Sequence, residues 1–268
     1  MSVREIPETV AAGSAAAVYA DIRRVFGVPF VPLVYRVLAT QPRRLEAIWA
    51  ELGPNLGSDD AQCAARTLNP PPAPGVAVQP VQHDGVTLDI DAAVATLQAF
   101  RHTNSLNIIG LAALLQGVEA AEPRGRTPSA LRANESTLPM VDLQALPDST
   151  LALLEEMSAA IVGTEQPIVI PSLLRCFAHD ERLLTILWEA IRECVESPEF
   201  ANRASAIEAK ARTIATELPY RTTRLEHQET RQLVERFVGT ISAMIVVGDL
   251  LEAVILDLAS RRDSRELG

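Results

Sequence analysis

Side chains that could carry chemistry are few in this chain, and none of them falls in a familiar local motif. The sequence holds no glycine-rich phosphate loop, no GxSxG nucleophile turn, no HExxH pair and no EF-hand loop. The four histidines form no pair at metal-ligand spacing, and Asp180, which follows His179, is explained as the N-cap of the next helix. We therefore expect neither a metal ion nor an organic cofactor.

Two polar interruptions of apolar segments are more informative. Asp249, Glu252 and Asp257 interrupt the most apolar segment, and the first two would share one helix face. Such a pair is either a base with a raised pKa or part of a solvated stripe. Asn104 lies in the periodic segment HTNSLN, where it is either the N-cap of a helix that begins at Ser105 or a polar site residue.

The composition is that of an ordinary globular protein with an acid surplus. Of the 268 residues, 48% are hydrophobic and 22% are charged, and the formal net charge is −10. Because phosphate binding needs clustered lysine and arginine, we expect no nucleic-acid partner and no anionic-membrane partner. No apolar run reaches the roughly 20 residues of a membrane span, and the N-terminus lacks a signal-peptide pattern. The sequence predicts a cytoplasmic protein.

The three cysteines, Cys63, Cys176 and Cys194, are widely spaced and form no CxxC pair. An odd and sparse set in a chain of this length favours reduced thiols over a disulfide framework. Free cysteine is among the most buried residue types. We therefore expect all three side chains to be buried as small apolar groups.

Apolar periodicity predicts an all-α fold. The expected helices cover about residues 18–26, 30–39, 42–52, 91–118, 149–162, 168–178, 180–195, 199–217 and 229–259. The prolines of NPPPAPG, residues 69–75, predict a linker, and residues 76–81 a short strand-like piece. A second linker is expected at residues 122–139, which lack periodicity.

An internal repeat organises these helices. Residues 171–191 repeat residues 32–52 at an offset of 139, and residues 236–254 repeat residues 99–117 in the same order. The identical pairs are Pro32/Pro171, Arg36/Arg175, Ala39/Ala178, Arg43/Arg182, Leu45/Leu184, Trp49/Trp188, Phe100/Phe237, Thr103/Thr240, Ser105/Ser242, Ile108/Ile245 and Leu114/Leu251. The repeat predicts a pseudo-dimer of two fused helical halves, residues 1–121 and 140–268, with 122–139 as the linker. Equivalent residues would meet at a cavity between the halves.

The run YADIRRVFGVPFVPLVYRVLATQPRRL, residues 19–45, resembles the start of the non-stereospecific (group I) 2-haloacid dehalogenases. That family has a Y-x-D-I-R box, then V-P with an aromatic residue, then R-V-L-A-T. The resemblance continues at AFRHTN, at LPMVDL and through the second half, and it is weakest around residues 55–90. It implies an all-α fold of two fused repeats with the site between them. It also implies a hydrolase in which an aspartate activates a water to displace halide from C2 of a short 2-haloacid.

The resemblance implies particular site residues, position by position. The family's asparagine falls on Asn104, and the serine beside its catalytic aspartate falls on Ser172. The tryptophan and phenylalanine of its pocket wall fall on Phe30 and Leu33, and a tyrosine of its second half falls on Phe237. The resemblance therefore implies that Asn104 is a catalytic residue and that Phe30, Leu33, Ser172 and Phe237 line the substrate pocket.

The position of the catalytic aspartate is Leu173, which cannot deprotonate water, and no carboxylate lies within two residues of it. Two hypotheses follow. The first is a dehalogenase-type hydrolase of a small organic acid that uses another base, with Asp21, Asp249 and Glu252 as candidates. The second is a non-catalytic relative, either a small-acid binding protein or a structural helical protein. The sequence leaves open whether two chains associate as a homodimer.

Overall fold

The computed structural model of the chain is described over residues 4–68, 88–119, 137–163 and 169–266. Within these ranges the predicted all-α class is confirmed, and the extended structure is limited to one isolated bridge between Val118 and Thr222. The helices are α1 (Gly13–Phe26), α2 (Leu33–Leu38), α3 (Pro42–Leu56), α4 (Asp59–Leu68), α5 (Ile90–Gln116), α6 (Asp148–Val162), α7 (Ser172–Phe177), α8 (Glu181–Val195), α9 (Pro198–Ala215) and α10 (Gln228–Glu266). Short 3-10 helices, η1 (Glu8–Val10) and η2 (Leu143–Ala145), precede α1 and α6.

Each helix that the periodicity predicts is present, but α4 was not predicted. Its sequence is DDAQCAARTL, and its buried apolar side chains are Ala61, Ala65 and Leu68. Its alanine-rich face is periodic, but sequence reasoning did not recognise it. The expected linker at 69–75 and the strand-like piece at 76–81 lie outside the described residues, as does most of the expected linker at 122–139.

Helix ends are set by local chemistry. Gly27 ends α1 in the left-handed conformation, with φ at 65°, and its N–H donates to the carbonyl of Arg23 at 2.9 Å. The predicted N-cap at Asp180 is confirmed, because its carboxylate accepts from the backbone N–H groups of Arg182 and Leu183. With this cap, α8 begins a few residues after the end of the short helix α7.

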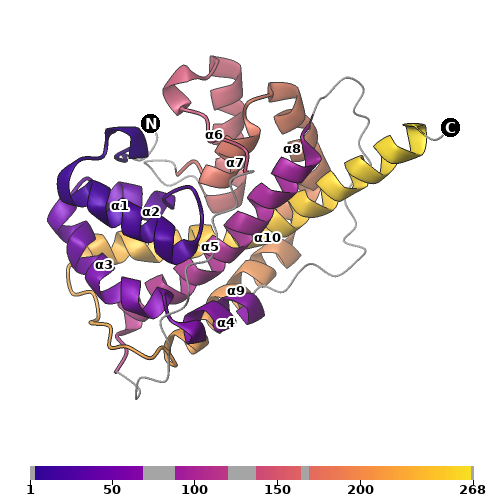
Figure 1. Cartoon of the computed structure of the whole chain (residues 1–268). Helices are drawn as coiled ribbons and strands as arrows, with labels where there is room; N and C mark the ends of the chain where they lie inside the picture. The colour runs from indigo at the N-terminus through magenta and orange to yellow at the C-terminus, as the bar shows by residue number, and fades with distance from the viewer. Residues whose placement is uncertain (1–3, 69–87, 120–136, 164–168, 267–268) are drawn as a thin grey trace.

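The two longest helices, α5 and α10, pack against each other through the centre of the molecule. Figure 1 shows α1, α2 and α3 at one end of this pair and α6, α7 and α8 at the other. Helix α9 packs on both α5 and α10. The long pair is therefore the frame on which the shorter helices are held.

The apolar core consists of two clusters, and both long helices enter both of them. Leu106 of α5 and Val238 of α10 belong to the cluster formed with α1–α4. Leu97 of α5 and Val254 of α10 belong to the cluster formed with α6–α8. The first part of each long helix thus packs in the core of the other expected half, 1–121 or 140–268. The two expected halves therefore do not have separate cores.

Elements and contacts recur in the two parts of the chain. A 3-10 helix followed by five α-helices occurs first as η1 to α5 and again as η2 to α10. Trp49 donates its indole N–H to Asp21 of α1 at 2.9 Å, and its repeat counterpart Trp188 donates to Glu156 of α6 at 3.0 Å. Equivalent tryptophans therefore attach α3 to α1 and α8 to α6 in the same way.

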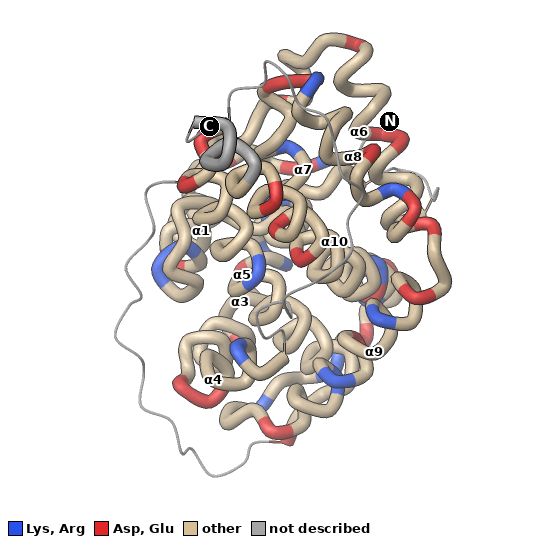
Figure 2. Tube along the Cα trace, turned by 90° about the vertical axis from the view of Figure 1, so that its right-hand side faces the viewer, with Lys and Arg blue, Asp and Glu red and all other residues tan. Residues whose placement is uncertain are grey.

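Charged residues are dispersed over the molecule. In Figure 2, basic residues lie on several helices and alternate with acidic ones. Among the described helices, none combines the length and the apolarity that crossing a bilayer requires. The expectation that the chain has no nucleic-acid partner stays a prediction.

The expectation of three buried thiols is correct only for Cys176, because Cys63 is exposed on α4 and Cys194 is partly exposed. Burial raises the pKa of Cys176 to about 12. We expect a disulfide reagent at pH 8 to label Cys63 quickly and Cys176 only after denaturation, as measured by mass spectrometry of timed digests. Native Cys176 labelling at the rate of Cys63 would contradict this burial, and a Cys63→Ser variant provides the control.

Candidate functional site

A small cavity of about 40 Å³ lies between α2, α5, α7 and α10. A buried water needs roughly 10–15 Å³ of such space, so the cavity has room for a few waters or for a solute of a few heavy atoms. Its lining residues are Pro32, Leu33, Val34, Phe100, Thr103, Asn104, Asn107, Val169, Pro171, Ser172, Leu173, Phe237, Thr240, Ile241 and Met244.

The structure brings most of the sequence-predicted site residues to this cavity. The predicted residues in its wall are Leu33, Asn104, Ser172, Leu173 and Phe237. Phe30 is not part of the lining, but its ring stacks on the lining residue Phe100 with ring centroids 4.4 Å apart. The N-cap interpretation of Asn104 is wrong, because α5 runs unbroken from Ile90 to Gln116.

The cavity is lined by repeat-related pairs of residues. At the offsets of 139 and 137, the pairs are Pro32/Pro171, Leu33/Ser172, Val34/Leu173, Phe100/Phe237, Thr103/Thr240, Asn104/Ile241 and Asn107/Met244. The remaining lining residue is Val169, and its counterpart at the offset of 139 is Phe30, which backs the wall. Sequence reasoning found several of these pairs but did not assign Thr103 and Thr240 to the site.

The two sides of the cavity differ in polarity although their positions are equivalent. Helices α5 and α7 contribute polar residues where α10 and α2 contribute apolar ones. These unlike pairs are Asn104/Ile241, Asn107/Met244 and Ser172/Leu33. The cavity therefore has a polar half on α5 and α7 and an apolar half on α10 and α2. Asn107 was missed by sequence reasoning, although it lies one helical turn beyond Asn104 and on the same face.

Two polar atoms of the wall have no hydrogen-bond partner within the described protein. They are Oγ1 of Thr103 and Oδ1 of Asn107, and both side chains are about 1% exposed. A buried polar atom without a partner costs roughly 1–3 kcal/mol. A ligand that donates to Asn107 and bonds Thr103 would offset this cost, so the polar half is suited to a polar group.

None of the described lining residues is an acid, a base or a thiol. Asp21, a candidate base, accepts from Trp49 and pairs with Arg24, away from the cavity. Asp249 and Glu252 both pair with Arg101. The solvated-stripe interpretation of these two is also wrong, since they are 3% and 7% exposed.

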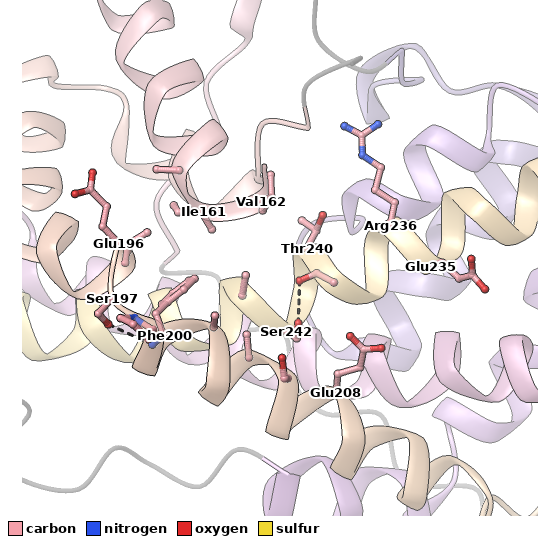
Figure 3. A pocket seen from close by; sticks show the side chains of 18 of the residues that line it. Ile161, Val162, Glu196, Ser197, Phe200, Glu208, Glu235, Arg236, Thr240 and Ser242 are labelled. Atoms are coloured by element: carbon pink, nitrogen blue, oxygen red, sulfur yellow. Dashed lines mark hydrogen bonds between the residues drawn. The ribbon is translucent and has the colours of Figure 1, made fainter. Parts of the chain in front are cut away.

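A larger and more open groove of about 1240 Å³ is lined by residues of α6, α9 and α10. Figure 3 shows Ile161 and Val162 at the end of α6 on one side of it and Phe200 and Glu208 of α9 on another. Thr240 of α10 belongs to the lining of both the groove and the cavity. The groove and the cavity thus share one lining residue.

No family model and no curated protein matches the chain. Solved structures do match it along almost its whole length. A D-2-haloacid dehalogenase in complex with L-LA superposes with a TM-score of 0.79 at 17% identity, covering 93% of this chain and 95% of that chain. The chain has the fold of the D-2-haloacid dehalogenases.

Two further structures of this fold agree with the first. A D-2-haloacid dehalogenase mutant matches with a TM-score of 0.74 at 16% identity. Another D-2-haloacid dehalogenase mutant, in complex with D-2-CPA, matches with a TM-score of 0.73 at 18% identity. Each comparison covers 93% of this chain and 94% of the other. The dehalogenase fold therefore accounts for both parts of the chain.

Proposed function

We propose that this chain is a dehalogenase-fold protein that binds a small organic acid in the cavity without hydrolysing it. The observation that carries the proposal is the composition of the wall, which offers one polar half, one apolar half and no group that could act as a base. A short-chain acid has the matching character, with a carboxylate at one end and an alkyl group at the other. Neighbours of the same fold occur in complexes with L-LA and D-2-CPA.

The proposal includes a pseudo-dimeric origin of the site. The recurrence of η1 to α5 as η2 to α10 supports two fused repeats, and so do the equivalent bonds of Trp49 and Trp188. The pairwise lining supports a site on the axis between them. Asn104 and Ser172 would be the polar residues kept from a group I dehalogenase, and Leu173 would replace its catalytic aspartate.

Hydrolysis of a 2-haloacid is the second candidate function, and the fold comparison favours it. The three dehalogenase structures each cover 93% of the chain. Hydrolysis requires a base at the cavity, and the described wall has leucine at the relevant position. We rank binding without hydrolysis first for this reason.

Titration calorimetry with lactate and 2-chloropropionate, together with a chloride-release assay, tests the proposed function. We expect both acids to bind the wild-type protein. Asn104→Leu should weaken binding by about tenfold, since it removes one buried hydrogen bond to a charged ligand, whereas the distant Cys63→Ser control should not. No chloride should be released from 2-chloropropionate above the buffer blank. Chloride release in proportion to protein concentration would favour hydrolysis as the function. If neither acid binds, the structural role is the remaining hypothesis.

A further inference from the structure

A buried cluster of charge lies behind the polar half of the cavity. Arg36 of α2 and its repeat counterpart Arg175 of α7 both pair with Glu5, each at an N···O distance of 2.7 Å. The two arginines are 4% and 8% exposed. The neighbouring carboxylate, Glu8, is paired with Arg23. Two guanidinium groups therefore share one carboxylate, which leaves one positive charge in excess.

Only one of the two arginines reaches the cavity wall. Arg36 donates from Nη2 to the Ser172 hydroxyl at 2.8 Å, and its Nη1 lies 3.3 Å from the sulfur of Met140. Arg175 instead donates from Nε and Nη2 to the carbonyl of Val141. The wall residue equivalent to Ser172 in the first half is Leu33, which has no hydroxyl for Arg175 to reach.

The hydrogen bond from Arg36 decides what Ser172 can do. A serine hydroxyl has one hydrogen to donate and can accept with its lone pairs. In the described chain its one protein hydrogen bond is the one it accepts from Arg36, so its own hydrogen is left to donate toward the cavity that Ser172 lines. An adjacent cation strengthens such a donor, and the low dielectric of a buried site strengthens it further.

We propose that Arg36 is a positioning residue that makes Ser172 a charge-assisted donor to the carboxylate of the bound acid. The inference rests on the proposed function and adds the source of its selectivity for anions. The positive charge of Arg36 acts on a bound carboxylate through its hydrogen bond to Ser172, a bond that Arg175 lacks. A neutral ligand of the same shape gains less from this charge-assisted donor, so the arrangement favours an anion in the cavity.

The test compares Arg36→Gln with Arg175→Gln, and lactate with the neutral analogue lactamide, by titration calorimetry. Both variants lose an ion pair to Glu5, so both should unfold at lower temperature. Only Arg36→Gln should weaken lactate binding, by about tenfold or more, and it should leave lactamide binding unchanged. Ser172→Ala, which keeps the charge cluster intact, should weaken lactate binding similarly. In its background Arg36→Gln should have little further effect.

The outcomes separate this inference from the proposed function. If lactamide binds the wild-type protein as tightly as lactate, the cavity binds small ligands but Arg36 does not select anions. Equal loss of lactate binding in Arg36→Gln and Arg175→Gln would also overturn the inference. Should Arg36→Gln fail to fold, the ratio of lactate to lactamide affinity in Ser172→Ala decides, and an unchanged ratio overturns it. A wild-type protein that binds neither ligand overturns both proposals.

Discussion

Replacement of Leu173 by aspartate is expected to introduce halide release from 2-chloropropionate. Leu173 lines the cavity together with Asn104 and Ser172, so the new carboxylate would lie beside the groups proposed to hold the acid. A positioned base contributes about 10²–10⁴-fold to such reactions. We expect chloride release from 2-chloropropionate to rise at least about 100-fold above the wild-type background.

The same substitution should cost stability and give a characteristic pH profile. Leu173 is 2% exposed and belongs to the core cluster around α6–α8. Loss of its side chain and burial of a carboxyl group together cost about 2–5 kcal/mol of unfolding free energy. Burial favours the protonated form and raises the pKa of the new carboxyl group. The rate of chloride release should therefore increase with pH through that raised pKa and then level off.

Leu173→Asn is the matched control for this experiment. It has nearly the shape of aspartate and no basic carboxylate, so it should release no chloride while losing similar stability. A folded Leu173→Asp protein that binds lactate but releases no more chloride than Leu173→Asn would contradict the prediction. Urea unfolding of each variant establishes that the comparison is made on folded protein.

Removal of Arg101 is expected to have the largest effect on stability. Its guanidinium on α5 pairs with Asp249 at 3.0 Å and with Glu252, both on α10. Arg101→Met would keep much of the packing but leave the two buried carboxylates without this partner, although Arg203 still contacts Asp249. Breaking a buried pair in this way costs about 3–5 kcal/mol, which urea unfolding at pH 7 should show.

Acidification should relieve much of this loss. Without Arg101, the two buried carboxylates lack this cation, and protonation removes the charge that is left without it. The penalty is then largest at neutral pH and shrinks as the carboxyl groups become protonated in acid. Adding Glu252→Gln to Arg101→Met should recover part of the stability at pH 7. If Arg101→Met lowers the unfolding free energy by less than about 1 kcal/mol, the ion pairs of Arg101 with Asp249 and Glu252 behave as solvated surface pairs.

Much of the fold follows from local sequence, because helix periodicity and caps act over a few residues. Residue types alone predict the caps at Gly27 and Asp180. They also predict the apolar faces of the long helices. Helix α4, whose buried face is mostly alanine, was not recognised. The repeat predicted that equivalent residues would meet at one cavity. Of the six site positions predicted from the sequence, all but Phe30 line that cavity.

The parts that sequence reasoning missed depend on contacts between distant segments. Arg101 and Asp249 are 148 residues apart, so their pairing could not be recognised from spacing, and Asp249 was read as solvated or catalytic. Arg36 is identical to its counterpart Arg175, and only the structure shows that it alone reaches Ser172 across 136 residues. Asn107 could have been predicted as a site residue from local sequence, since it shares a helix face with Asn104.

The contacts of Glu5 also bear on the order in which the chain can fold. Glu5 closes an ion pair with Arg175 over a separation of 170 residues, and contacts of such long range form slowly and late. During synthesis the N-terminal segment emerges first, yet its carboxylate meets this second arginine only after α7 has been made. Until then Arg36 is its single buried guanidinium partner. The charge balance behind the cavity is therefore completed only after α7 has been synthesised.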